Sequence, residues 1–147
     1  MRRARRWTMD DGLWTMDDGV KINLFIPKLN MPFKFEKLEI WQLAIDMADD
    51  VHILTRNFPK EEMFILTSQM KRAADSISLN IAEGSTGQSN PEQIKFIGYA
   101  QRSALEVVNC IFLAKRRGYI DDLIFNRFYN NSQKLIAKIQ AFKNAIK

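Results

Sequence analysis

Apolar residues recur at steps of three and four along most of the chain after residue 38, which is the spacing of one face of an amphipathic helix. Four continuous stripes result: Ile40, Ala44, Met47, Val51, Leu54 and Phe58; Met70, Ala73, Ala74, Ile77 and Ile81; Ile97, Ala100, Ala104, Val107, Ile111 and Ala114; and Phe125, Phe128, Ser132, Leu135, Ile139, Phe142 and Ile146. The pattern predicts four long helices. Because the connections are short, we expect an all-α, antiparallel up-down-up-down four-helix bundle.

Residues that cap or break helices set the expected helix ends. They are Pro59 between the first two helices, Gly84 and Asn90 around the next connection, Gly118 after the third helix, and Asp121 or Asp122 before the fourth. We expect the second helix to run from Pro59 to Glu83 and Gly84 to take the left-handed conformation that closes it. Asn90, followed by Pro91, is expected to cap the third helix.

The first 32 residues have a different character from the rest. Residues 7–13 and 14–20 are two copies of a heptapeptide that differ only at the last position, Leu13 against Val20. Asp-Gly pairs in both copies indicate turns, and an isolated two-stranded ribbon is marginal in water. We therefore predict an irregular, poorly ordered appendage over residues 1–32, with Met31 as the more natural start of the protein, and a bundle domain over residues 33–147.

A second, polar stripe runs beside the apolar one on the second helix. It comprises Gln69, Arg72, Ser76, Asn80 and Glu83. Gln, Ser and Asn are only middling helix formers but suit fixed hydrogen bonds, so the stripe indicates specified contacts. In a hairpin of the second and third helices, Arg72 would lie near Ser103 and Glu106. We predict a largely buried Arg72–Glu106 ion pair within a network that fixes helix register or subunit contacts, and a cationic or amide partner for Glu83.

Charge is distributed unevenly along the chain. Residues 31–90 carry 6 Lys/Arg and 9 Asp/Glu, whereas residues 91–147 carry 10 and 4. An uneven solvated surface is the simplest explanation. Two others stay open: the basic half could contact nucleic-acid phosphates, or it could face the acidic half of a neighbouring copy in a head-to-tail ring.

Additional apolar positions lie beside two of the stripes. They are Trp41, Ile45 and Ala48 on the first helix, and Leu105, Val108 and Phe112 on the third. Such positions widen the core-facing surface, or they form an interface between subunits.

Candidate phosphate ligands gather in the basic half. They are Lys115, Arg116 and Arg117 at the end of the third helix, and Arg127, Lys134 and Lys138 on the fourth. The alternative is that they are favourable cations at a helix C-terminus and ordinary solvated positions.

Composition excludes several classes of function. The chain has one cysteine, Cys110, and one histidine, His52, too few for a disulfide within the chain or a His/Cys metal cluster. We expect Cys110 to pack as a small apolar residue and His52 to lie on an exposed shoulder of the first helix. No apolar run is long enough to span a membrane, and the N-terminus lacks the apolar core of a secretory signal, so we expect a cytoplasmic protein. The sequence predicts no catalytic residue, metal or cofactor.

Several segments resemble one known family. The run Gln69–Gly84 is similar to the signature of the four-helix-bundle family named for the 23S rRNA intervening-sequence proteins, which includes the accessory variability determinant of diversity-generating retroelements. Further matches are Phe35, Leu38 and Trp41; Phe58-Pro59 with Glu62; Ser103 with Leu105-Glu106; and Gly118-Tyr119-Ile120. The resemblance covers residues 33–147.

The resemblance implies a bacterial protein without known catalysis whose protomers form a homopentameric barrel. It also implies a nucleic-acid-binding accessory role and a protein partner such as a reverse transcriptase. Two hypotheses follow: an oligomer that contacts RNA or DNA through its basic residues, or a structural adaptor that binds another protein and has no nucleic-acid role.

Overall fold

The computed structural model describes residues 6–10, 13–22, 33–87 and 89–146. The chain divides into two compact units, Met1–Pro32 and Phe33–Lys147, and each is described by itself.

The first unit contains a small antiparallel sheet within the segment predicted to be irregular. Its strands are β1 (Trp7–Asp10), β2 (Leu13–Met16) and β3 (Lys21–Ile22), in the order β1-β2-β3. The two heptapeptide copies pair with each other, with Thr8 opposite Thr15. Gly19, at φ 82°, allows the turn from β2 to β3 because glycine has no steric penalty at positive φ.

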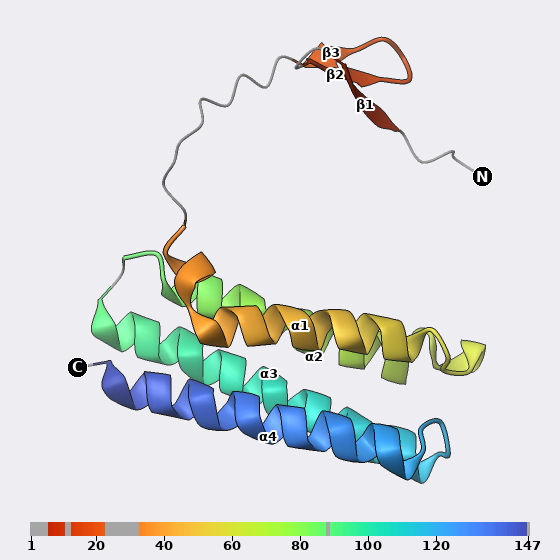
Figure 1. Cartoon of the computed structure of the whole chain (residues 1–147), viewed down its shortest axis with the longest axis vertical. Helices are drawn as coiled ribbons and strands as arrows, with labels where there is room; N and C mark the ends of the chain where they lie inside the picture. The colour runs from red at the N-terminus through yellow and green to blue at the C-terminus, as the bar shows by residue number, and fades with distance from the viewer. Residues whose placement is uncertain (1–5, 11–12, 23–32, 88, 147) are drawn as a thin grey trace. The chain divides into compact units, whose positions relative to one another are not determined.

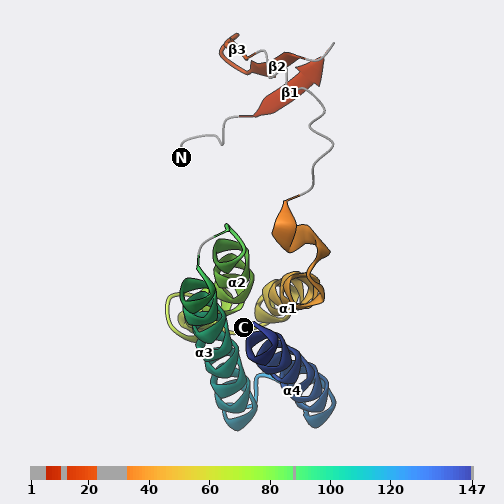
Figure 2. The ribbon, with the colours of Figure 1, turned by 90° about the vertical axis from the view of Figure 1, so that its left-hand side faces the viewer.

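The second unit is the predicted four-helix bundle (Figures 1 and 2). Its helices are α1 (Glu39–Thr55), α2 (Leu66–Gly84), α3 (Asn90–Arg116) and α4 (Asp122–Ala145), and two short 3-10 helices, η1 (Lys34–Lys37) and η2 (Lys60–Glu62), precede α1 and α2. Each helix packs against its neighbours in the chain, and α1 also packs against α4, whereas α1 and α3 make no contact and lie diagonally opposite. Within the described residues, no helix is long and apolar enough to cross a membrane.

The apolar stripes form the core, as predicted. The stripes of α2 and α3 are buried throughout, and Ala44, Ala74 and Ala100 are fully buried where the helices approach one another. Ser132 occupies a core position of α4 and is also buried, and its hydroxyl has no hydrogen-bond partner among the described residues. Leu54, Phe142 and Ile146 are only partly buried because they lie towards the ends of the bundle.

The prediction that a single helix begins at Pro59 is wrong. After η2 the chain makes a turn, and Ile65, with φ −118° and ψ −101°, is not helical. Glu62 accounts for the new start, because its carboxylate accepts a hydrogen bond from the Leu66 backbone N–H at 3.2 Å. Such a bond satisfies one of the N–H groups that a helix start leaves without a partner.

Gly84 does not have the predicted left-handed conformation. It is buried within the last turn of α2, and the positive φ of 84° belongs to Gly87 instead. A Cβ atom on Gly84 would lie 3.1 Å from Phe96 Cβ and 3.5 Å from the Gln93 carbonyl oxygen, so α2 and α3 approach too closely there for a side chain. The cap of α3 is likewise Ser89, one residue earlier than predicted, and Asn90 is the first helical residue.

The end of α3 and the start of α4 agree with the prediction. Gly118, at φ 75°, follows α3, and the Tyr119 N–H bonds to the Ala114 carbonyl while the Gly118 N–H bonds to that of Lys115. This is the bonding pattern of a Schellman motif. Asp121 caps α4 by accepting a 2.8 Å hydrogen bond from the Ile124 N–H.

Candidate interaction surfaces

The polar stripe of α2 joins α2 to α3, but not through the predicted ion pair. Gln69 lies between the two charged groups: its amide N–H donates to Glu106 at 3.1 Å, and its amide oxygen accepts from Arg72 at 3.2 Å. Arg72 and Glu106 are exposed and form no direct salt bridge, so the prediction of a buried pair is wrong. Gln69 lies about one helical turn closer to Glu106 than Arg72 does, so Gln69 and not Arg72 contacts the carboxylate.

The remaining members of the stripe differ in their contacts. The Ser76 and Ser103 hydroxyls lie 2.7 Å apart, and the Asn80 amide donates to the Ser76 carbonyl at 2.8 Å. The Ser76–Ser103 bond joins α2 to α3 and helps to fix the register of the two helices, whereas the Asn80–Ser76 bond lies within α2. Glu83 is exposed, and the predicted partner of its carboxylate is not found among the residues that the structure describes.

A second polar cluster, which the polar stripes did not reveal, surrounds Glu62. The side chain of Glu62 is 10% exposed and accepts hydrogen bonds from the Tyr119 hydroxyl at 2.9 Å and the Arg117 guanidinium at 3.1 Å. The Tyr119 ring also packs against Phe58, with ring centroids 5.6 Å apart. The cluster therefore ties η2 to the connection between α3 and α4. Phe58, Glu62 and Tyr119 all belong to segments that carry the family resemblance, which was the only sequence signal for this cluster.

The hydrogen bonds at Glu62 set the direction of two pKa shifts. The hydrogen bond from Tyr119, supported by the Leu66 N–H and by Arg117, lowers the pKa of Glu62, although burial opposes it. The same hydrogen bond raises the pKa of Tyr119, because ionisation would remove the donated proton. The cluster is therefore most stable with Glu62 ionised and Tyr119 neutral.

Four of the six predicted phosphate ligands have carboxylate partners within the bundle. The partnered cations are Lys115 with Asp122 at 3.1 Å, Arg117 with Glu62 at 3.1 Å, Arg127 with Asp50 at 3.0 Å, and Lys138 with Glu39 at 2.8 Å. Lys115 also lies 4.2 Å from the centroid of the Phe125 ring. A phosphate would have to compete with these carboxylates. Arg116 and Lys134 are exposed and have no ion-pair partner among the described residues.

Two helix faces that point away from the core combine apolar and charged residues. The α3 face comprises Arg102, Leu105, Asn109, Phe112 and Arg116, all exposed and spaced by three and four residues. The α1 face comprises Gln42, Ile45, Asp49, Ile53 and Arg56, also all exposed. Of the residues at the predicted second apolar edges, Ile45, Leu105 and Phe112 remain 40%, 57% and 51% exposed, whereas Ala48 is buried.

The outward sides of α2 and α4 differ from these two faces. Each exposes one large apolar residue, Leu79 on α2 and Leu123 on α4.

The helices α1 and α3 also carry opposite net charges. Helix α1 contains four Asp/Glu and no Lys/Arg, whereas α3 contains four Lys/Arg and two Asp/Glu. Within the faces themselves, the α3 face carries Arg102 and Arg116, whereas the α1 face carries Asp49 and Arg56 and has no net charge. The molecule thus has one basic apolar face and one apolar face without net charge on diagonally opposite helices.

His52 and Cys110 do not form a reactive site. The His52 ring nitrogen Nε2 lies 3.3 Å from the Asp75 carboxylate on the shoulder between α1 and α2. Cys110 is 2% exposed, and burial raises the pKa of its thiol, which keeps it protonated. Among the described residues, no group of three or more His, Cys, Asp or Glu side chains is placed to hold a metal ion.

Comparison with known proteins agrees with this architecture. The model of a family described as 23S rRNA-intervening sequence protein matches residues 36–141. The chain is also similar to a crystal structure of a protein of unknown function from the S23 ribosomal protein family of Bacteroides thetaiotaomicron. That similarity has a TM-score of 0.66 and 20% sequence identity over 72% of this chain and 96% of the other. No curated protein matches. Because the family model covers most of the bundle, the chain belongs to the 23S rRNA-intervening sequence protein family.

Proposed function

We propose that this protein is a non-enzymatic scaffold that assembles with copies of itself, by packing the α1 face of one copy against the α3 face of the next. The observation that carries the proposal is the pair of unpartnered faces. Both expose large apolar side chains, their helices have opposite charge, and they lie on diagonally opposite helices. Burial of the apolar residues would supply affinity, and attraction between Asp49 and the arginines of the α3 face would help to select the correct pairing.

The geometry also favours a particular symmetry. An interface between two different faces leaves one of each free, so a further copy can always be added until the assembly closes into a ring. Five copies, the number that the family resemblance implies, would have a mass of about 86 kDa from protomers of 17.2 kDa.

Sedimentation velocity of the full chain tests the proposal. We expect the wild type to sediment as an oligomer and the variant Leu105→Glu to dissociate, because it would bury a carboxylate in the apolar part of the interface. Leu79→Glu is the matched control, since Leu79 is 59% exposed and Leu105 is 57% exposed, but only Leu105 lies on a proposed interface. A wild type that stays monomeric at all accessible concentrations, or equal behaviour of the two variants, contradicts the proposal.

The geometry supports nucleic-acid binding less well than it supports self-assembly. Four of the six candidate cations already have carboxylate partners, and Arg116 lies on the α3 face. Fluorescence anisotropy with labelled RNA and DNA separates the two functions. A phosphate-binding surface requires affinity that falls steeply with salt and falls again when Arg116 and Arg117 become Gln. The scaffold proposal expects weak binding that these substitutions leave nearly unchanged.

A further inference from the structure

A cavity lies between α1 and α4, away from the two faces of the proposed interface. Of the four pairs of adjacent helices, α1 and α4 pack together least extensively. The cavity between them has a volume of about 240 Å³. This is below the range of roughly 300–1,000 Å³ that is usual for pockets binding drug-sized ligands, so a ligand would have to be smaller.

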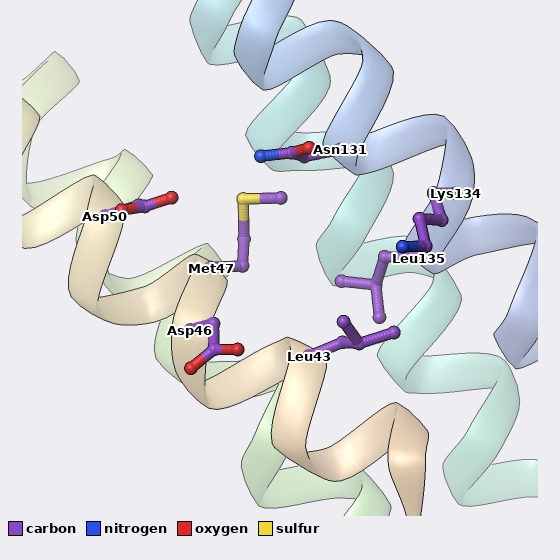
Figure 3. A pocket seen from close by; sticks show the side chains of 7 residues that line it. All are labelled: Leu43, Asp46, Met47, Asp50, Asn131, Lys134 and Leu135. Atoms are coloured by element: carbon purple, nitrogen blue, oxygen red, sulfur yellow. The ribbon is translucent and has the colours of Figure 1, made fainter.

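The cavity has an apolar floor. Leu43 and Met47 of α1 and Leu135 of α4 line it, and Figure 3 shows Met47 and Leu135 projecting into the gap between the two helices. Met47 is 5% exposed and Leu135 is 2% exposed, so the rest of the bundle holds both in place. Because the bundle covers most of both side chains, the floor offers little apolar area and limits a ligand to a short aliphatic side chain.

Opposite charges lie on the two walls. Asp46 and Asp50 come from α1, and Asn131 and Lys134 come from α4, with the Asn131 amide directed towards α1 (Figure 3). Asp50 is already neutralised by Arg127, which donates hydrogen bonds to both of its carboxylate oxygens at 3.0 Å. Asp46 and Lys134 form no ion pair with each other or with any other described residue, although Lys134 lies near enough to Glu39 to help lower the pKa of that carboxyl. The site thus offers one carboxylate and one ammonium group that are not in a direct ion pair, above an apolar floor.

This combination selects among ligand classes. A fatty acid could pair with Lys134 but would leave Asp46 without a partner, and an amine could pair with Asp46 but would leave Lys134 without one. A zwitterion meets an opposite charge at both ends. We therefore propose that the cavity binds a free α-amino acid with a short aliphatic side chain. Its ammonium group would pair with Asp46, its carboxylate with Lys134 and the Asn131 amide, and its side chain would lie on Leu43, Met47 and Leu135.

Isothermal titration calorimetry of the full chain with L-leucine tests this site. Two analogues each lack one charge: 3-methylbutylamine has no carboxylate, and 4-methylpentanoate has no ammonium group. We expect saturable binding of L-leucine and binding at least about tenfold weaker for each analogue, because each leaves one protein charge without a partner. Asp46→Asn and Lys134→Gln should weaken L-leucine binding to a similar extent. Asp75→Asn, which removes an exposed carboxylate of α2 outside both the cavity and the proposed interface, should not.

Several outcomes would overturn the proposal. They are no heat of binding with millimolar L-leucine, equal binding of either analogue, and equal effects of Asp46→Asn and Asp75→Asn. Preferential binding of 4-methylpentanoate or of 3-methylbutylamine would assign the cavity to a fatty acid or an amine instead. Circular dichroism of each variant confirms that the bundle is intact. The oligomeric state is measured in parallel, so a failure here is distinguishable from a failure of self-assembly.

Discussion

Ser132 is the one described residue whose buried side-chain hydroxyl lacks a hydrogen-bond partner. It occupies a core position of α4, between Phe128 and Leu135 in the apolar stripe. Burying a hydroxyl without a partner costs free energy that an apolar side chain of similar size would not cost. By contrast, the Ser103 hydroxyl, also buried, lies 2.7 Å from that of Ser76. The Ser103 hydroxyl therefore contributes to the stability of the fold, whereas the Ser132 hydroxyl lowers it.

Replacing each serine by alanine should have opposite effects. We expect Ser132→Ala to raise the free energy of unfolding by about 1 kcal/mol, and Ser103→Ala to lower it by about 1 kcal/mol because Ser76 loses the closer of its two hydroxyl partners, Ser103 and Asn80. Urea denaturation at one fixed protein concentration measures both. A loss of stability in Ser132→Ala would mean that its hydroxyl has a partner in solution, such as a bound water.

Single residues also show why the predicted contacts were only partly correct. Of the predicted polar stripe, Gln69 and Ser76 contact α3, whereas Arg72 and Asn80 form hydrogen bonds only within α2. The exact partners depend on differences of one helical turn between α2 and α3, and that offset placed Gln69 rather than Arg72 beside Glu106. The ion pairs of Arg127 and Lys138 could not be predicted from spacing either, because their partners lie on α1, about 80 to 100 residues away in the sequence.

At the scale of the helices, the periodicity was sufficient to predict the four elements and their buried faces. The errors occurred at the ends, where local contacts decide the conformation. Pro59 and the two glutamates after it suited a helix start, but Glu62 turns inward to Tyr119 and Arg117 and caps α2 four residues later. Gly84 suited a helix end, but the close approach of Phe96 explains the glycine instead.

Gly84 should therefore be sensitive to substitution although its backbone is helical. We expect Gly84→Ala to lower the free energy of unfolding by about 1–3 kcal/mol, because the added methyl group must displace Phe96 or the α3 backbone. Gly98→Ala is the matched control. A Cβ atom there meets only the flexible end of Lys143 at 3.6 Å, so alanine should stabilise α3 by about 0.5–1 kcal/mol. Thermal denaturation of both variants would contradict this account if Gly84→Ala were the more stable.

The Glu62 cluster should make the connection between η2 and α2 sensitive to acid. The folded pKa of Glu62 lies below its ordinary value of 4.5, so its stabilising contribution is complete above that value and is lost as the pH falls through the folded pKa. We expect the free energy of unfolding to decrease between pH 5 and the acid limit, by less in Glu62→Gln than in the wild type. Chemical denaturation across this range measures the difference.

Glu39 provides the control for this pH dependence. Its pKa is also lowered, mainly by the hydrogen bond from Lys138, but its side chain is 66% exposed. Solvent screens such a pair, so Glu39→Gln should change the acid response much less than Glu62→Gln does. Equal responses of the two variants would show that Glu62 has no special role.

At the scale of the whole molecule, the bundle leaves two dissimilar faces without a partner. The uneven charge of the sequence allowed either a phosphate-binding surface or a head-to-tail assembly. Two observations favour head-to-tail assembly. Most candidate cations on α3 and α4 have carboxylate partners, and the apolar residues Ile45, Ile53, Leu105 and Phe112 stay exposed. The sequence alone could not separate these cases, because the periodicity of a helix does not show which positions a neighbouring helix covers.

The most direct test of head-to-tail assembly is native mass spectrometry of two variants, alone and mixed. Ile53→Lys blocks the α1 face by placing a cation opposite the basic α3 face. Leu105→Glu blocks the α3 face by burying a carboxylate in the apolar interface. Each variant alone should be monomeric. An equimolar mixture should form a 1:1 complex of the two variants with a mass of about 34 kDa. The intact α3 face of Ile53→Lys can still bind the intact α1 face of Leu105→Glu. A mixture that stays monomeric, or variants that each retain the mass of the wild-type assembly, would contradict the account.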